Sequence, residues 1–196
     1  MDDFLYYNEE KMEEIEMVQY GAVCGRFQIF HMDHLQYCLA AAHRCEHLIV
    51  GITSPDKSVN PPEAVDPHRC TDEANPCNYY ERMKMIEGAL LEAGLPRERF
   101  DIVPFPIGKP ELISAYVPAG VTVFVTVLDS WGQCKTERMK DFGYDVQVLW
   151  ERDDKIISSS MIRGLIRAGR EWSQFVPPAT CRFIREQKID ERIVKM

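Results

Sequence analysis

The chain has 196 residues, of which 45% are hydrophobic and 28% charged, enough to fold as one domain around a sizeable core. Its net charge of −8 argues against a nucleic-acid partner, because such proteins usually carry a basic face. No apolar run reaches the roughly 18 residues of a membrane span. The seven cysteines form no C-x-x-C pair and predict free thiols in a reducing, cytoplasmic setting.

The elements expected along the chain alternate between strands and helices after an acidic surface arm, residues 1–17, and fill a single domain, residues 18–196. Asp33 is the expected N-cap of the first helix, with Gln36 completing a capping box. Apolar and β-branched runs predict strands over residues 18–24, 47–52, 100–105, 121–128 and 146–150. Helices are expected over residues 34–44, 79–93, 111–116, 136–142, 160–168 and 181–187.

This alternation predicts an α/β fold, a Rossmann-like, doubly wound and mostly parallel five-stranded sheet with helices on both faces. Ligands of such folds bind at the carboxyl ends of the strands. The loop after the first strand and the loop entering the helix at Ser160 should therefore lie at the same edge of the sheet. The polar stretch 53–76 is too long for an ordinary connection, which indicates a functional or mobile loop.

The sequence GRFQIFHMDH, residues 25–34, is the first candidate phosphate-binding segment. Gly25 permits a tight turn, and the helix that follows presents free N–H groups to an anion. His31 and His34 are one turn apart and can both donate to phosphate oxygens, while Arg26 adds a fixed charge. An isolated H-x-x-H pair is common, so the alternative is an ordinary polar helix start.

A second candidate segment is SSSMIR, residues 158–163. Ser160 is the expected N-cap of the next helix, and the serine hydroxyls add to the anion-binding capacity of the helix start. Arg163 lies one turn further and can clamp a phosphate with two bonds. Taken alone, a plain capped helix with a solvated arginine explains this segment equally well.

In this order, the motifs G-R-F-Q-x-F-H-x-x-H and S-S-S-x-I-R resemble those of the nucleotidylyltransferase superfamily, and in particular archaeal-type nicotinamide-nucleotide adenylyltransferases. Residues 75–82 resemble the N-P-F-x-x-x-E-R stretch of that family, and residues 172–177 its W-x-x-L-V-P. The text of residues 52–56 and 103–107 is also similar to a branch that includes cytidylyltransferases of phosphonate natural-product pathways.

The resemblance implies transfer of a nucleoside monophosphate from an NTP to a small phosphonate or phosphate acceptor, with release of pyrophosphate and no covalent intermediate. Mg²⁺ would be held mainly by the triphosphate, without a protein-built metal site. The implied catalytic residues are His31, His34 and Arg163. Nucleotide contacts are expected from Gly25, Arg26, Phe27, Gln28, Asp129, Trp131, Ser158, Ser159 and Ser160, and acceptor contacts from Lys57, Arg69 and Lys109.

Three departures from the family pattern bear on the substrates. Asp33 stands where the family usually has glycine, and Ser159-Ser160 where it has Gly-Thr. No tryptophan lies between Phe105 and Val121 to stack a nicotinamide ring. We therefore expect a small acceptor with CTP as donor. The alternatives are an ATP-dependent nicotinamide-nucleotide adenylyltransferase and a nucleotide-binding regulator without catalysis, and a homo-oligomer is left open.

Overall fold

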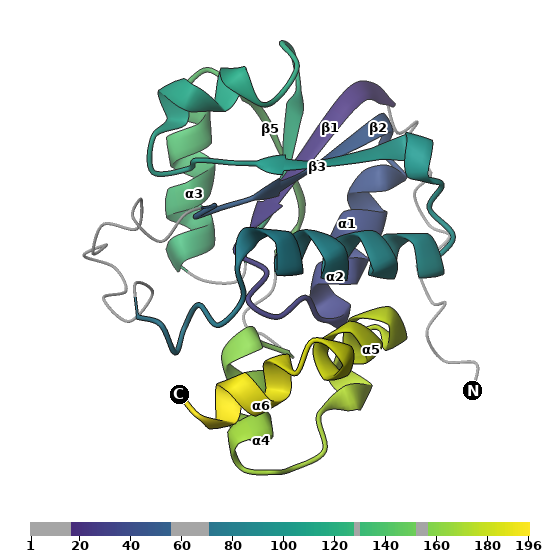
Figure 1. The fold of residues 1–196 in the computed structure, drawn as a ribbon. Coiled ribbons are helices and arrows are strands. Elements are labelled where there is room, and N and C mark those ends of the chain that lie inside the picture. Colours follow the sequence, from purple (N-terminus) through teal and green to yellow (C-terminus); the bar gives the residue numbers. More distant parts are fainter. Residues whose placement is uncertain (1–16, 56–70, 128–129, 152–156) are drawn as a thin grey trace.

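The computed structural model describes residues 17–55, 71–127, 130–151 and 157–196, so the expected arm 1–17 lies outside the described residues except for Met17. Strands and helices alternate along these residues as expected (Figure 1). The strands are β1 (Val18–Gly25), β2 (Cys45–Ile52), β3 (Phe100–Pro104), β4 (Thr122–Val127) and β5 (Asp145–Glu151). The α-helices are α1 (Met32–Ala42), α2 (Tyr79–Glu92), α3 (Ser130–Asp141), α4 (Ser159–Arg167), α5 (Pro178–Glu186) and α6 (Ile189–Val194), with short 3-10 turns η3 (Arg97–Arg99), η4 (Pro110–Ala115) and η5 (Ser173–Phe175).

The strands form one five-stranded sheet in the order β3-β2-β1-β4-β5, and every neighbouring pair is parallel. This confirms the predicted Rossmann-like α/β class, with a sheet that is fully parallel. The strand order reverses direction between β1 and β4, which is the topological switch point where ligands bind in such folds.

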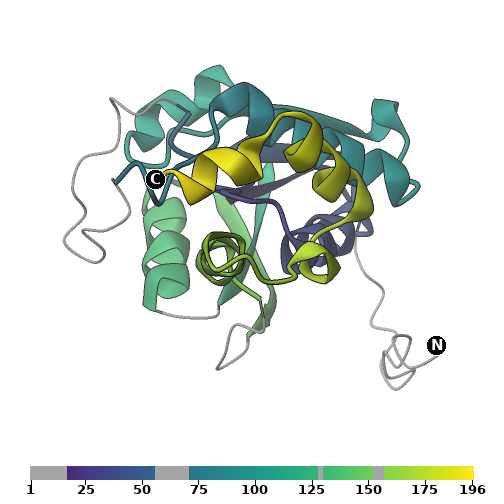
Figure 2. The same cartoon turned by 60° about the horizontal axis from the view of Figure 1, so that its bottom comes forward.

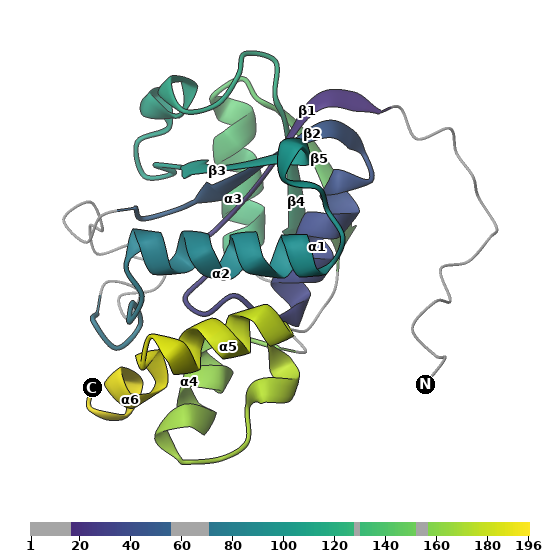
Figure 3. The same ribbon diagram turned by 45° about the vertical axis from the view of Figure 1, so that its right-hand side comes forward.

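Both faces of the sheet are covered, as a parallel sheet requires. Side chains alternate along β1, so that Val23 enters one core while Ala22 and Cys24 enter the other. The larger core lies under α1 and α2 and includes Leu48 and Ile86. The smaller core lies on the α3 and η4 side (Figure 3).

The C-terminal helices α4, α5 and α6 form a further layer against α2 and the β1–α1 connection (Figure 2). Their apolar side chains Ile162, Ile184, Ile189 and Ile193 are fully buried in the larger core. Arg182 on α5 donates to Glu92 of α2 at 2.8 Å. This bond holds α5 against α2, and α6 contacts both α5 and α4.

Two predicted helix caps are wrong. α1 begins at Met32 with His31 as N-cap, because the Asp33 carboxylate accepts a hydrogen bond from the Ile157 N–H (3.3 Å) instead of capping its own helix. α4 is capped by Ser158, not Ser160, since the Ser158 hydroxyl accepts from the Met161 N–H at 3.1 Å.

Two further differences concern the extent and number of the helices. α3 begins six residues before the expected start. The helix α6 was not expected: the chain turns at Lys188, which has a left-handed conformation (φ 52°) although it is not the glycine that usually marks such a turn.

None of the described helices is long and apolar enough to cross a membrane. The five cysteines whose side chains are described, Cys24, Cys38, Cys45, Cys77 and Cys181, are buried free thiols, as predicted for them.

Candidate active site

The carboxyl edge of the sheet gathers the turns that leave β1, β2 and β3 and the entry to α4. Between β1 and β4 the pairing is confined to Gly21 with Thr122 and Ala22 with Val123, although both strands continue further toward this edge. Past that point the carbonyl of Phe124 accepts a hydrogen bond from the hydroxyl of Tyr37 on α1. The hydrogen-bonded pairing of β1 with β4 therefore ends early at the switch point, beside the first candidate segment.

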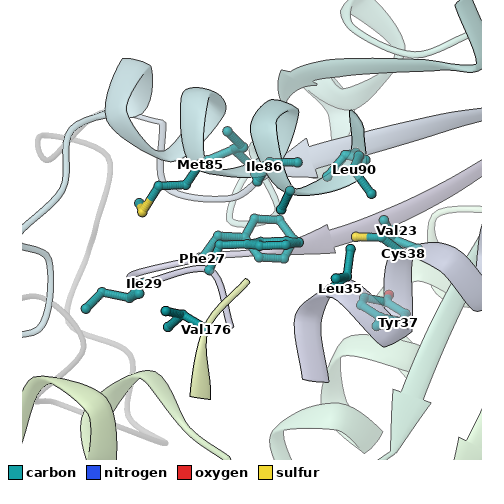
Figure 4. Packing of buried hydrophobic residues seen from close by; sticks show 14 of the residues in the cluster. Val23, Phe27, Ile29, Leu35, Tyr37, Cys38, Met85, Ile86, Leu90 and Val176 are labelled. Carbon is teal, nitrogen blue, oxygen red and sulfur yellow. The ribbon is translucent and has the colours of Figure 1, made fainter. Parts of the chain in front are cut away.

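Gly25 and Phe27 shape the turn after β1. A Cβ added to Gly25 would lie 2.8 Å from ring carbon Cε1 of Phe27, so only glycine admits this approach. Phe27 itself has a left-handed backbone (φ 52°) and is 1% exposed. Its ring fills the space between α2 and the chain that precedes α1 (Figure 4). Phe27 thus contributes packing that holds the turn in place.

The two histidines of the motif form a stacked pair at the start of α1. Their ring centroids are 3.6 Å apart with planes 20° apart, and the ring of Phe27 contacts His34 edge-on at 4.9 Å. The backbone N–H of His31 donates to Nδ1 of His34 at 3.4 Å. Because Nδ1 is the acceptor, a neutral His34 carries its proton on Nε2.

Arg163 is 5% exposed and reaches back from α4 to the first segment. Its Nη1 donates to the carbonyl of Gln28 at 2.6 Å, and its Nη2 donates to the hydroxyl of Ser160 at 3.1 Å. Burial, with the nearby charge of Arg167, lowers the pKa of the Arg163 guanidinium from its usual value. Among the described residues no carboxylate lies within ion-pair distance of it. A buried cation bonded only to neutral oxygens is suited to an anionic ligand.

Side-chain hydrogen bonds join the two candidate segments. The Ser159 hydroxyl donates to the carbonyl of Ile29 at 3.0 Å, and Asp33 accepts from the N–H of Ile157 at 3.3 Å. With the Arg163 bond to Gln28, these contacts hold the starts of α1 and α4 side by side. The sequence expectation that both segments lie at one edge of the sheet is met by this geometry.

Gln28 is 3% exposed, and both polar atoms of its side chain form hydrogen bonds with the backbone of Cys77. Its Nε2 donates to the carbonyl of Cys77, and its Oε1 accepts from the N–H of Cys77, both at 2.9 Å. Burial raises the pKa of the Cys77 thiol to about 12, so it is neutral at physiological pH. Gln28 therefore fixes the turn before α2 to the site through its side chain.

Sequence reasoning did not single out Arg82, which is 2% exposed inside α2. Its guanidinium donates to backbone carbonyls of the turns that follow β1 and β2. The only sequence signal was its place at the end of the N-P-x-x-x-x-E-R stretch.

The expected acceptor residues are described only in part. Lys109 is exposed and precedes η4 in the segment that follows β3, where its N–H bonds the carbonyl of Pro106 at 2.7 Å. Lys57, Arg69 and Asp129 lie outside the described residues. Trp131 lies in the first turn of α3, and its side chain is also outside the description. Their roles stay predictions.

A parallel α/β sheet with two anion-suited helix starts joined at its carboxyl edge defines a Rossmann-like nucleotide-binding protein. More particularly, the chain belongs to the cytidylyltransferase-like family, whose sequence profile matches residues 22–165. It is 48% identical to the phosphonoformate cytidylyltransferase of Streptomyces viridochromogenes over 88% of this chain and 94% of that protein. It is 31% identical to the nicotinamide-nucleotide adenylyltransferase of Thermococcus kodakarensis over 90% of this chain and 88% of that protein.

Among solved structures, a bifunctional NMN adenylyltransferase/ADP ribose pyrophosphatase from Francisella tularensis superposes with a TM-score of 0.65 and 17% identity. The match covers 91% of this chain but only 53% of that one, about half its length, and shows the shared fold. With relatives that are cytidylyl- and adenylyltransferases, the chain is a nucleotidyltransferase. The alternative of a regulator without catalysis is thereby set aside.

Proposed function

We propose that the protein transfers CMP from CTP to a small phosphonate and releases pyrophosphate. The observation that carries the proposal is the 48% identity, over 88% of the chain, with a phosphonoformate cytidylyltransferase. The ATP-dependent nicotinamide-nucleotide reaction is the second candidate, supported by relatives that are 31% identical.

In the proposed reaction an oxygen of the phosphonate attacks the α-phosphorus of CTP. A new P–O bond forms there while the bond from the α-phosphorus to the bridging oxygen of the β-phosphate breaks, and that oxygen leaves as part of pyrophosphate. Nothing in this exchange requires a covalent bond to the protein. Catalysis then consists of positioning the two substrates and stabilising the charge that develops on the leaving group.

The residues at the joined helix starts fit these roles. Nε2–H of His34 and the N-terminus of α1 would bind oxygens at the reacting phosphates, and His31 orients His34 through their stacked rings. Arg163, buried beside Ser160, would bind the β- and γ-phosphates.

Mg²⁺ is the expected companion of the triphosphate, since it bridges phosphate oxygens and neutralises their charge. The described residues contain no group of three or more His, Cys, Asp or Glu side chains that could enclose a metal ion. Asp33, the carboxylate nearest in sequence to the histidines, accepts from the Ile157 N–H. We expect Mg²⁺ to arrive bound to the triphosphate and to keep water ligands.

The segment after β3 supports a small acceptor. Phe105 is fully buried, and its ring lies against Gly51, where an added Cβ would meet it at 2.5 Å. Phe105 is therefore core and not a stacking platform. No tryptophan lies between Phe105 and Val121, so this segment lacks the tryptophan that would stack a nicotinamide ring. A phosphonate requires only cations and N–H donors, such as exposed Lys109.

The test is a matrix of CTP, ATP, GTP and UTP against phosphonoformate, an aminoalkylphosphonate, nicotinamide mononucleotide and a simple phosphomonoester, read by pyrophosphate release. We expect the highest kcat/KM for CTP with a phosphonate. A highest value for ATP with nicotinamide mononucleotide would replace the proposal with the second candidate. Each pair is repeated without acceptor, because hydrolysis of the NTP alone also releases pyrophosphate.

A further inference from the structure

Arg82 is one of the most deeply buried side chains in the described part of the chain, at 2% exposure near the start of α2. Burial lowers the pKa of Arg82 to about 10, which still leaves the guanidinium charged at neutral pH. No carboxylate of the described residues forms an ion pair with it. A buried charge costs several kcal/mol unless hydrogen bonds compensate it. The hydrogen-bond partners of Arg82 therefore decide whether its burial is tolerated.

Those partners are four backbone carbonyls. Nε donates to Asn78 at 3.2 Å, within the first turn of its own helix. Nη1 donates to Arg26 at 3.0 Å and to Thr53 at 2.9 Å, and Nη2 donates to Ser54 at 2.9 Å. One planar group thus holds the turn after β1 and the turn after β2 at fixed spacing, which a lysine could not do with a single nitrogen.

Both turns contain a residue in an unfavourable backbone conformation. Phe27, directly after the Arg26 carbonyl, has φ 52°, and Ser54 has φ 50°. A left-handed conformation costs a residue other than glycine about 1 kcal/mol or more. The guanidinium bonds lie at these two strained positions and oppose their relaxation.

Both turns lie at the edge of the sheet that carries the proposed site. The first continues into His31 and His34 at the start of α1. The second follows β2, the neighbour of β1 in the sheet, and so lies at the same carboxyl edge, where ligands of such folds bind. Arg82 therefore lies where two neighbouring turns of this edge can be fixed relative to each other.

We propose that Arg82 is a positioning residue: by bonding the carbonyls of Arg26, Thr53 and Ser54 it fixes the turn after β2 relative to the histidine-bearing turn after β1, and so keeps the substrate-binding edge in its reactive geometry. The inference rests on the proposed function, in that the reaction joins two separately bound substrates. Loss of this geometry lowers the rate of their reaction more than the binding of either one, because a misplacement of about 1 Å can cost on the order of 100-fold.

Arg99 provides a matched control for simple loss of stability. Its side chain is half-buried, and Nη2 donates to the carbonyls of Ala42 (3.2 Å) and Cys45 (2.9 Å). These carbonyls belong to the α1–β2 connection at the amino edge of the sheet, opposite the site. Arg99→Lys thus removes the same kind of arginine–backbone contact without touching the substrate turns.

The experiment compares wild type, Arg82→Lys and Arg99→Lys, at a temperature where urea titration shows each protein to be folded. Calorimetry gives the dissociation constant of CTP, and pyrophosphate release gives kcat with the substrate pair that wild type turns over best. For Arg82→Lys we expect kcat to fall about 10- to 100-fold while CTP affinity changes less than about fivefold. Arg99→Lys should keep kcat within about twofold of wild type.

Wild-type kcat in folded Arg82→Lys, or an equal fall in Arg99→Lys, would overturn the proposal. If Arg82→Lys does not fold, it is measured again with trimethylamine N-oxide, which favours compact states. Failure to fold even then assigns Arg82 to stability alone and also overturns the inference. A wild-type protein that prefers ATP and nicotinamide mononucleotide refutes the proposed function only, and the Arg82 comparison is then made with that pair.

Discussion

Replacing Gly25 with alanine tests whether the turn after β1 depends on the close approach of Phe27. The new methyl group would lie 2.8, 2.9 and 3.3 Å from three carbons of the Phe27 ring, which is buried and cannot move into solvent. Overpacking of this kind costs about 1–3 kcal/mol. For a domain of this size that corresponds to a fall in Tm of about 2–12 °C.

The same substitution should reduce activity in the molecules that remain folded. The ring of Phe27 contacts His34 edge-on at 4.9 Å, so a displaced Phe27 moves the histidine. We expect kcat for pyrophosphate release to fall about 10- to 100-fold at a temperature where the variant is folded. The assays are thermal unfolding by circular dichroism and steady-state kinetics.

Two further variants control this prediction. Gly164→Ala, in α4, meets nothing within 4 Å and should stabilise the protein by up to about 1 kcal/mol. Adding Phe27→Leu to Gly25→Ala should cost less than the sum of the single changes, with a coupling of about 0.5–3 kcal/mol. Wild-type Tm and kcat in Gly25→Ala, or strict additivity in the double variant, would refute the steric reasoning.

Three other outcomes follow from the site. His34→Ala should lower kcat about 100- to 1,000-fold with the fold intact, as for loss of one charge-stabilising donor; wild-type turnover would contradict this role. Arg163→Ala should weaken binding of the NTP more than of the NMP in calorimetry, since its proposed partners are the β- and γ-phosphates, and equal losses would place it elsewhere. EDTA should abolish turnover without changing the circular dichroism spectrum, because Mg²⁺ is expected on the nucleotide and not in a protein site; full activity in EDTA would contradict this.

The α/β class and most strands could be predicted because the apolar runs of a fully parallel sheet are local in sequence. The β-branched run that forms β4, for example, is typical of a buried strand and not of a helix. Helix starts were harder. α1 begins one residue after His31, a residue type that rarely caps helices, while Asp33, a frequent cap, bonds Ile157, which is 124 residues away in sequence.

In the candidate site, too, the features that depend on contacts between distant residues could not be predicted. The two motifs could be placed together from the alternation of strands and helices alone, because it predicts a parallel sheet and parallel strands share a carboxyl edge. The burial of Arg163 and the engagement of Gln28 by Cys77 could not be predicted, since they depend on contacts across 135 and 49 positions. Arg82 donates to backbone carbonyls, which every residue has. Its partners could therefore not be predicted from the types of side chain in the sequence.

The bonds that join residues 28–33 to residues 157–163 also have a consequence for the order of events during synthesis. They span 124 to 135 positions, so at typical elongation rates the first segment waits roughly 6 to 27 s for its partners to be made. Until then Phe27 and Ile29 lack the apolar cover of the C-terminal helices. In the nascent chain this apolar surface therefore stays uncovered for that time, and the site proposed for the nucleotide is complete only after α4 has docked.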